Sequence, residues 1–395
     1  MVPWRIVLGI LLVIGFGCKQ KPEEAPKGPI RIGGSLALTG RFADDGKYVH
    51  QGYLLWAKHV NAKGGLLGRP IELLIYDDKS DPQTSVYRYQ QLILQDKVDL
   101  VLGPVNSPIA IVASTVTEKL RYPMIPLASS EEIWNQGYRY VFGLATPATH
   151  FFDGAWAIAK QHGLRRIALI NENTVFAHSV ARGVIESARE MGFQLVFHEE
   201  YRKGKKDFQW LLREIKVLKP DVLLTGSYFE ETKLITRQLK QVNFMPKLYA
   251  VGFGAHQDEF GADLGKDAEY VLGWSEWEPH PGLGFPGMQE FIEDFRKEFG
   301  RLPSGLAARG YAAGQVLEAA VTKVGSLDRE KIRDTLANLD MVTVYGRYKV
   351  DQDGLAIGHD VFLIQWQHGK KEIVWPERYA TAKLIYPIPS WSARR

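Results

Sequence analysis

The sequence predicts an α/β protein built from two lobes, each a parallel sheet covered by helices on both faces. Short apolar segments typical of buried strands alternate with amphipathic segments typical of helices. The alternation runs from residue 30 to about residue 127 and restarts near residue 151. A length of 395 residues is enough for two such units, and two successive series favour two lobes over a single barrel.

The first series begins directly after a polar N-terminal segment. Strands are expected at 30–38, 71–76 and 98–102, and a fourth short apolar run lies at 123–127. A loop at 39–46 should lead to a helix, because Val49, Tyr53, Trp56 and Val60 recur at helical spacing.

Two further helices of this series should begin at Asp81-Pro82 and Ser107-Pro108. In each pair the first residue can cap the helix, and proline suits the first turn.

The second series repeats the pattern. Helices are expected at 151–162, 177–191, 207–218 and 230–242, and strands at 166–170, 193–197, 221–225 and 248–251. After Val271 the pattern changes: residues 278–287 are rich in proline and glycine and should form a loop. Helices are then expected at 288–299, 306–324 and 329–339. The segment 346–366 alternates like antiparallel strands, with a turn at 351–354.

The composition excludes several classes of protein. Hydrophobic residues make up 45% and charged residues 24%, as in ordinary soluble globular proteins. The net charge of +4 is too small and too dispersed to indicate nucleic-acid binding. One long apolar run, at the N-terminus, argues against a polytopic membrane protein. A single cysteine excludes a disulfide framework and any multi-cysteine metal site.

The N-terminus has the design of an export signal. Arg5 precedes a short apolar stretch that ends at Phe16, and Cys18 follows Gly17. The sequence Gly15-Phe16-Gly17-Cys18 resembles a bacterial lipoprotein box, although Gly15 stands where the box prefers leucine. We therefore expect residues 1–17 to be a lipoprotein signal peptide, Cys18 to be lipidated, and residues 18–28 to form a flexible tether. The alternative is a plain export signal with an incidental cysteine.

Catalytic signatures are absent from the sequence. There is no G-x-S-x-G elbow, Walker loop, H-E-x-x-H or C-x-x-C motif. A G-x-G-x-x-G string at 282–287 follows a proline and not a strand, which argues against a dinucleotide site. His256 and Glu259 have the spacing of metal ligands on a helix, but no third ligand can be identified, so ordinary surface or core roles are favoured.

Two turns after strands of the first lobe carry hydroxyl groups. Ser107 lies in the turn after the third strand, and Ser129 and Ser130 follow the next apolar run. Ligands of parallel sheets bind beyond the carboxyl ends of the strands, and a helix N-terminus there favours an anion. The sequence thus suggests a carboxylate site. The alternative is that Ser107 only caps its helix and that Ser129 and Ser130 only form a turn.

The segment from Asn61 to Leu73, NAKGGLLGRPIEL, carries a family resemblance. With the aspartates Asp77-Asp78 and the pair Asp81-Pro82 that follow, it resembles the first-lobe signature of periplasmic substrate-binding proteins of the leucine/isoleucine/valine-binding type. Leu38-Thr39-Gly40 and the segment 125–130 fit the same pattern, and the resemblance extends over residues 29–375.

The resemblance implies a specific architecture. It implies two doubly wound parallel-sheet lobes joined by three crossovers, with a ligand cleft between them that closes by a hinge. Lobe 1 would hold residues 29–147 and 278–342. Lobe 2 would hold residues 148–277 and 343–395.

The resemblance also implies ligand contacts. Carboxylate contacts fall on Ser107, the backbone at Leu127, and Ser129, with Ser130 beside them. Aromatic contacts from the second lobe fall on Phe176 and Tyr228.

The position that would hold an acid for a ligand α-ammonium falls on Phe253, which leaves amino-acid specificity open. Glu172, Glu230 or Glu231 on nearby loops could replace that acid. Each aromatic residue could instead pack only within its own lobe.

The function implied is capture without chemistry. A lipid-anchored, monomeric binding protein in the periplasm or at the cell surface would deliver a small solute to the permease subunits of an ABC importer. It would need no cofactor or metal and bind no nucleic acid. The alternative is a ligand sensor of the same fold that signals to a membrane partner. An exported hydrolase would need a nucleophile–base pair that the sequence does not offer.

Overall fold

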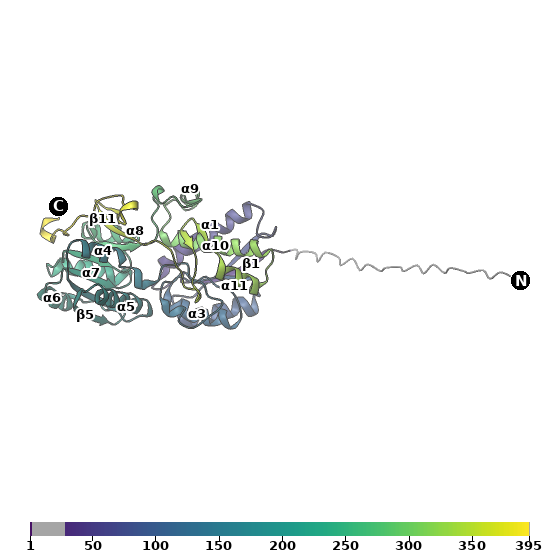
Figure 1. Cartoon of the computed structure of the whole chain (residues 1–395), viewed down its shortest axis with the longest axis horizontal. Coiled ribbons are helices and arrows are strands. Elements are labelled where there is room, and N and C mark those ends of the chain that lie inside the picture. The colour runs from purple at the N-terminus through teal and green to yellow at the C-terminus, as the bar shows by residue number, and fades with distance from the viewer. Residues whose placement is uncertain (2–27, 395) are drawn as a thin grey trace.

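The computed structural model describes Met1 and residues 28–394, and within them the chain forms two lobes that lie side by side (Figure 1). The predicted export signal and Cys18 lie outside the described residues. No helix of the described part is both long enough and apolar enough to span a membrane.

The first lobe is built on a three-stranded parallel sheet in the order β2-β1-β3. Its strands are β1 (Ile30–Leu36), β2 (Ile71–Asp77) and β3 (Leu100–Leu102). Its helices are α1 (Ala43–Ala62), α2 (Pro82–Gln90), α3 (Ser107–Lys119), α9 (Met288–Phe299), α10 (Gly305–Val324) and α11 (Arg329–Asn338). A small antiparallel ribbon joins β9 (Met341–Thr343) to β10 (Gly346–Tyr348).

Two sequence expectations for this lobe are wrong. The run at 123–127 forms only one isolated bridge, from Met124 to Val141, because Pro123 and Pro126 have no N–H to donate to a sheet. Helix α1 begins at Ala43, inside the segment expected to be a loop. This earlier start places Asp45 in the first turn of α1, which is important for the cleft.

The second lobe contains a seven-stranded sheet in the order β12-β11-β8-β7-β6-β4-β5. Its strands are β4 (Arg166–Glu172), β5 (Gln194–Tyr201), β6 (Val222–Gly226), β7 (Leu248–Val251), β8 (Leu272–Ser275), β11 (Phe362–Gln367) and β12 (Lys370–Trp375). Its helices are α4 (Asp153–Gln161), α5 (Val175–Glu190), α6 (Gln209–Val217), α7 (Phe229–Gln241) and α8 (Asp258–Leu264).

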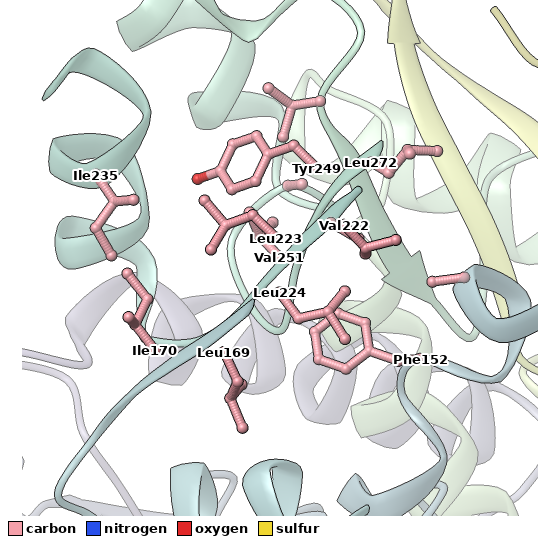
Figure 2. Close-up of a cluster of buried hydrophobic side chains, with 14 of the residues drawn as sticks. Phe152, Leu169, Ile170, Val222, Leu223, Leu224, Ile235, Tyr249, Val251 and Leu272 are labelled. Atoms are coloured by element: carbon pink, nitrogen blue, oxygen red, sulfur yellow. The ribbon is translucent and has the colours of Figure 1, made fainter. Parts of the chain in front are cut away.

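The core of this lobe follows directly from its apolar strands. Leu169, Leu224 and Val251 are fully buried in three neighbouring parallel strands (Figure 2). By the register of the strands, Leu169 and Leu224 lie on one face of the sheet and Val251 on the other, so both faces are buried. Strand β8 and helix α8 were not expected from the sequence, because both are short and lack a clear period. The antiparallel tail is confirmed: β11 pairs with both β8 and β12 in antiparallel fashion.

The chain passes between the lobes three times. The first crossing links β3 and its following helix to α4, the second links β8 to α9, and the third links β10 to β11. Parallel strands place the turns that follow them at the same edge of each sheet. The turns after β1, β3, β4, β6 and β7 therefore face one cleft between the lobes, and the helices α1, α3, α5, α7 and α8 begin there.

Helices α1 and α10 pack closely against each other in the first lobe. A Cβ atom at Gly52 would lie 2.2 Å from the Ala307 carbonyl oxygen, and one at Gly314 would lie 2.1 Å from the Trp56 ring. Only glycine permits these approaches. Arg309 lies on α10 between these contacts and is held at the cleft.

Candidate functional site

A small cavity between the lobes brings together five of the residues selected from the sequence. Ser107 and Ser129 line it from the first lobe; Phe176, Tyr228 and Phe253 line it from the second. The other lining residues were not selected from the sequence: Asp45, Val105, Asn106, Phe151, Trp274, Leu306 and Arg309. The centre of a water molecule can occupy only about 20 Å³ of this space. A larger solute can enter only if the lobes move apart or aromatic side chains rotate.

Leu127 and Ser130 do not line this cavity. The Leu127 backbone is occupied within the protein, since its N–H donates to the Pro104 carbonyl at 2.9 Å and its carbonyl accepts from Arg309 at 2.8 Å. The Ser130 hydroxyl lies 2.7 Å from the Ser179 hydroxyl of α5 and 3.3 Å from the Val175 carbonyl. Ser130 thus joins the two lobes directly.

The two cavity serines present hydroxyl groups at the first lobe. Ser107 is the first residue of α3, and its Oγ accepts from the Ser130 N–H at 3.3 Å. The residue that caps α3 is Asn106, whose side chain makes no capping bond. The Ser129 carbonyl accepts from the Ala148 N–H at 2.7 Å. The Ser129 hydroxyl takes no part in this bond, and Ser129 lines the cavity. Both hydroxyls lie near the positive end of the α3 dipole.

Aromatic rings form the second-lobe wall. Phe176 lies 5.1 Å from Tyr228, 5.8 Å from Phe253 and 5.7 Å from Phe151, measured between ring centroids. Trp274 stacks on Phe151 at 3.5 Å. The wall is therefore continuous and apolar, apart from the buried Tyr228 hydroxyl, which has no hydrogen-bond partner.

Asp45 is the carboxylate of the cavity. It is fully buried, and its two oxygens accept from Asn106 Nδ2 at 2.9 Å and from Gln257 Nε2 at 2.8 Å. Asn106 belongs to the first lobe, whereas Gln257 caps α8 in the second. Burial raises the pKa of Asp45 from its ordinary value of 3.8 to about 6, and the two amide donors oppose that rise.

Arg309 and Glu276 form a buried ion pair beneath the cavity. The guanidinium contacts Glu276 through Nη2, donates to the Leu127 carbonyl at 2.8 Å, and donates from Nε to the Tyr345 hydroxyl at 2.8 Å. Glu276 also accepts from the Thr146 N–H. Burial lowers the pKa of Arg309, but Glu276 and Tyr345 reverse this effect and raise it overall.

This ion pair connects two of the crossings to the first lobe. Thr146 lies in the first crossing and Glu276 in the second, whereas Tyr345 lies between β9 and β10, before the third crossing begins. One signal in the sequence could have located Arg309: it is the lone charge in an otherwise small and apolar stretch of α10, and such a charge requires a buried partner.

A second cluster of charges closes the mouth of the cleft. Arg41 of the first lobe lies over the Tyr228 ring, 4.8 Å from its centroid. Its Nη2 is 2.9 Å from both oxygens of Glu172 and 2.8 Å from Glu231, both in the second lobe. These are two of the glutamates that the sequence offered as partners for a ligand ammonium. Arg41 occupies them instead.

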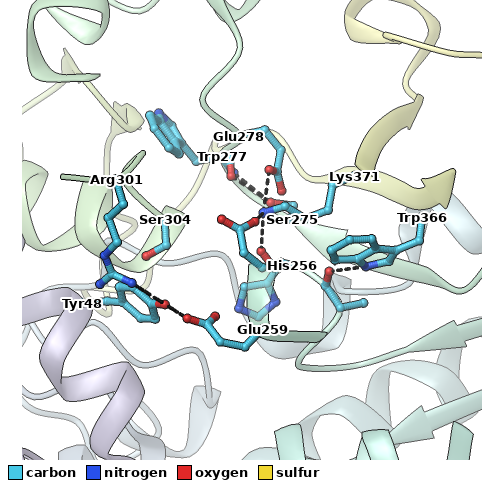
Figure 3. A network of polar contacts seen from close by, with 12 residues as sticks. Tyr48, His256, Glu259, Ser275, Trp277, Glu278, Arg301, Ser304, Trp366 and Lys371 are labelled. Carbon is cyan, nitrogen blue, oxygen red and sulfur yellow. Dashed lines mark hydrogen bonds and ion pairs between the residues drawn. The ribbon is translucent and has the colours of Figure 1, made fainter. Parts of the chain in front are cut away.

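A third polar contact joins the lobes along one flank (Figure 3). Glu259 of α8 accepts from the Tyr48 hydroxyl of α1, and Arg301 donates to the same hydroxyl at 2.8 Å. Lys371 lies 3.1 Å from Glu278, near the second crossing. His256 is buried, and burial lowers the pKa of its imidazole to about 3, so it is neutral. The described residues contain no group of three or more His, Cys, Asp or Glu suited to a metal ion, so the His256–Glu259 spacing has no metal partners there.

Comparison with known proteins shows to which family this chain belongs. The family model described as "Periplasmic binding protein" matches residues 29–371. The chain belongs to the periplasmic binding protein family. A "Leu/Ile/Val-binding protein homolog 7" of Brucella abortus (strain 2308) is 25% identical and covers 95% of this chain and 99% of its own length.

Two solved structures share the fold of this periplasmic binding protein. The branched-chain amino acid transporter substrate-binding protein LivJ of Streptococcus pneumoniae, in complex with isoleucine, has a TM-score of 0.79 and 23% identity, over 91% of this chain and 100% of its own. A solute-binding protein of an ABC transporter from R. palustris, in complex with benzoate, has a TM-score of 0.78 and 20% identity, over 90% and 98% of the two chains.

The Arg41 contacts predict an effect on the hinge. Arg41→Met should favour the open state, because it removes the guanidinium that pairs with Glu172 and Glu231 across the mouth. Small-angle scattering without added solute should give a larger radius of gyration for Arg41→Met than for the wild type. Lys47→Met, on the exposed face of α1, the helix that follows Arg41, is the control. Equal radii for all three proteins would contradict a role of Arg41 in closure.

The raised pKa of Asp45 predicts a pH dependence of stability. The folded protein holds this proton more tightly than the unfolded chain, so the contribution is fully present below about pH 3.8 and is lost as the pH rises through about 6. A rise of the pKa from 3.8 to about 6 corresponds to roughly 3 kcal/mol of unfolding free energy. The unfolding free energy of the wild type should fall relative to Asp45→Asn between pH 4 and pH 7. Parallel pH profiles for the two proteins would show that Asp45 is not desolvated in solution.

Proposed function

We propose that this protein is a lipid-anchored, extracytoplasmic component of an ABC importer that captures a small solute by hinge closure. The cavity between the lobes carries the proposal: donors from the first lobe face an aromatic wall from the second, so a solute that touches both favours the closed state. The protein performs no chemistry in this role, and permease subunits are its partners. It acts as a monomer in the periplasm or at the cell surface.

The solute we propose is amino-acid-like, or a small carboxylate or amide. Ser107 and Ser129 supply hydroxyl donors at a helix N-terminus, which suits a carboxylate. Phe176, Tyr228 and Phe253 suit an apolar body. The relatives named for leucine, isoleucine and valine support this class, and so does the similar fold in complex with benzoate. Leu127 and Ser130 have protein partners and could contribute only in an open state.

We also propose how the chain divides between the lobes. Residues 29–147 and 278–350 belong to lobe 1 and residues 148–277 to lobe 2, whereas the sequence placed the end of lobe 1 at residue 342. Tyr345 and Tyr348 pack in the core of the first lobe, so the third crossing is proposed to follow Val350, later than residue 343. The remainder of the chain then belongs to lobe 2.

Capture by closure predicts a measurable change in shape. Solutes released from the purified, denatured protein can be identified by mass spectrometry and then added back to the solute-free protein. The solute should reduce the radius of gyration in small-angle scattering, because it contacts both lobes at once. If no recovered or added solute changes the radius at saturation, the proposed capture by closure is wrong.

The first-lobe anchor predicts a loss of affinity without a loss of stability. Ser129→Ala removes a hydroxyl that faces the cavity, and losing one hydrogen bond to a charged group costs about 1.5–3 kcal/mol, or roughly ten- to a hundredfold in affinity. Calorimetric titration with the recovered solute measures the effect. Ser130→Ala is the comparison, because that hydroxyl faces Ser179. Unchanged affinity in both Ser129→Ala and Ser107→Ala would remove these hydroxyls from the site.

Lipidation at Cys18 predicts attachment to a membrane. In a bacterial host, Cys18→Ser should prevent lipid attachment and leave the processed or unprocessed protein without a fatty acyl mass. Fractionation and intact-mass measurement of both proteins provide the test. A wild-type protein that is soluble, carries no lipid and starts at another residue would contradict the lipid anchor while leaving solute capture untouched.

A further inference from the structure

The Asp45 carboxylate has no cation beside it. It is only 5% exposed, and no Lys, Arg or His nitrogen of the described residues pairs with it. Arg309, which lines the same cavity, is paired with Glu276. Each Asp45 oxygen accepts one amide N–H, and a carboxylate oxygen can accept two. A buried charge with free acceptor capacity is costly unless something cationic completes it.

Two further acceptors of the cavity also have capacity to spare. Asn106 Oδ1 and the Tyr228 hydroxyl are buried and have no hydrogen-bond partner, and both residues line the cavity with Asp45. The orientation of the Asn106 amide follows from its neighbour: its Nδ2 must donate to the carboxylate, so its oxygen remains free. Both side chains are about 95% buried, so water does not reach them easily.

We infer that Asp45, Asn106 and Tyr228 form a subsite for a cationic nitrogen of the captured solute. The inference rests on the proposed function and names a group that the solute carries. An ammonium has three N–H donors, and the subsite offers three acceptors, one with a formal negative charge.

The subsite differs from the one sought in the sequence. Phe253 at the expected acid position left amino-acid specificity open in the sequence. Glu172 and Glu231 do not supply the acid, because Arg41 pairs with both. Asp45 supplies it from the first turn of α1, on the opposite lobe. A divalent metal ion fits poorly here, because hard cations take six or more oxygen ligands and no cluster of acidic side chains is present among the described residues.

Matched solutes test the inference by calorimetric titration. Alanine, leucine and phenylalanine are each compared with the deaminated acid of the same skeleton (propanoate, 4-methylpentanoate and 3-phenylpropanoate) and with the amine that lacks the carboxylate. The wild type should bind at least one amine-bearing solute at least tenfold more tightly than its deaminated partner. Asp45→Asn should lower the affinity for that solute roughly ten- to a hundredfold. The affinity for the deaminated acid should stay unchanged or rise, because its carboxylate no longer lies near a buried negative charge.

Two further variants serve as controls. Asp44→Asn removes the neighbouring, exposed charge and should change the affinity by no more than about twofold. It therefore distinguishes an effect of the subsite from a general change in the electrostatic field. Tyr228→Phe removes only the hydroxyl and should lower the affinity for the amine-bearing solute more than the affinity for its deaminated partner. This comparison decides the matter even if Asp45→Asn fails to fold.

The outcomes separate the inference from the function beneath it. Tight binding of deaminated acids with no preference for an amine would overturn the cation subsite and leave solute capture standing. The inference would also be overturned if Asp45→Asn and Tyr228→Phe each lowered the affinity for the amine-bearing solute and for its deaminated partner equally. If neither amines nor acids bind, and no solute closes the lobes, the subsite and the capture function fail together.

Discussion

The buried pair of Arg309 and Glu276 is the interaction on which the rest of the structure depends. It brings residues of the first two crossings, Thr146 and Glu276, together with Tyr345 and the Leu127 carbonyl of the first lobe beneath the cavity. Breaking such a pair by removing one partner leaves an uncompensated charge in a medium of low polarity, which costs about 3–5 kcal/mol. The pair therefore fixes the positions of these two crossings relative to the floor of the cavity.

The contacts between the lobes divide into two kinds. Beneath the cavity they are short, buried and bound to the crossings, as in the ion pair. At the mouth and along the flank they consist of side chains from opposite lobes: Arg41 with Glu172 and Glu231, and Tyr48 with Glu259. The Arg41 pairs at the mouth are largely buried, because the Glu172 side chain is fully buried and that of Glu231 nearly so. Losing one partner of a buried pair is costly, so these contacts contribute to holding the two lobes together in this structure.

The cavity combines opposite polarities within a very small volume. Hydroxyl donors and the α3 N-terminus lie on one side, spare acceptors lie around Asp45, and aromatic rings fill the space between. Such an arrangement excludes unsuitable solutes as well as attracting suitable ones, since a solute that leaves Asp45 unpaired loses more free energy of binding than one that lacks an apolar contact. The shared fold cannot make this choice, because similar folds bind isoleucine in one case and benzoate in another.

The sequence by itself determined the alternation of strands and helices, the two lobes and five residues of the cavity wall. The alternation, the two lobes and the two cavity serines follow from local signals: apolar runs, helical periods and hydroxyl groups in the turns after strands. The three aromatic residues of the cavity wall came from the family resemblance. Only the tertiary structure decided the rest. Asp45 is an ordinary charge in the sequence and Arg309 only a lone charge in an apolar stretch, and their burial depends on partners 61 and 33 residues away, Asn106 and Glu276. Ser130 faces α5 and Glu172 faces Arg41 for the same reason: the partner of a polar side chain is set by packing between distant segments, which no local pattern encodes.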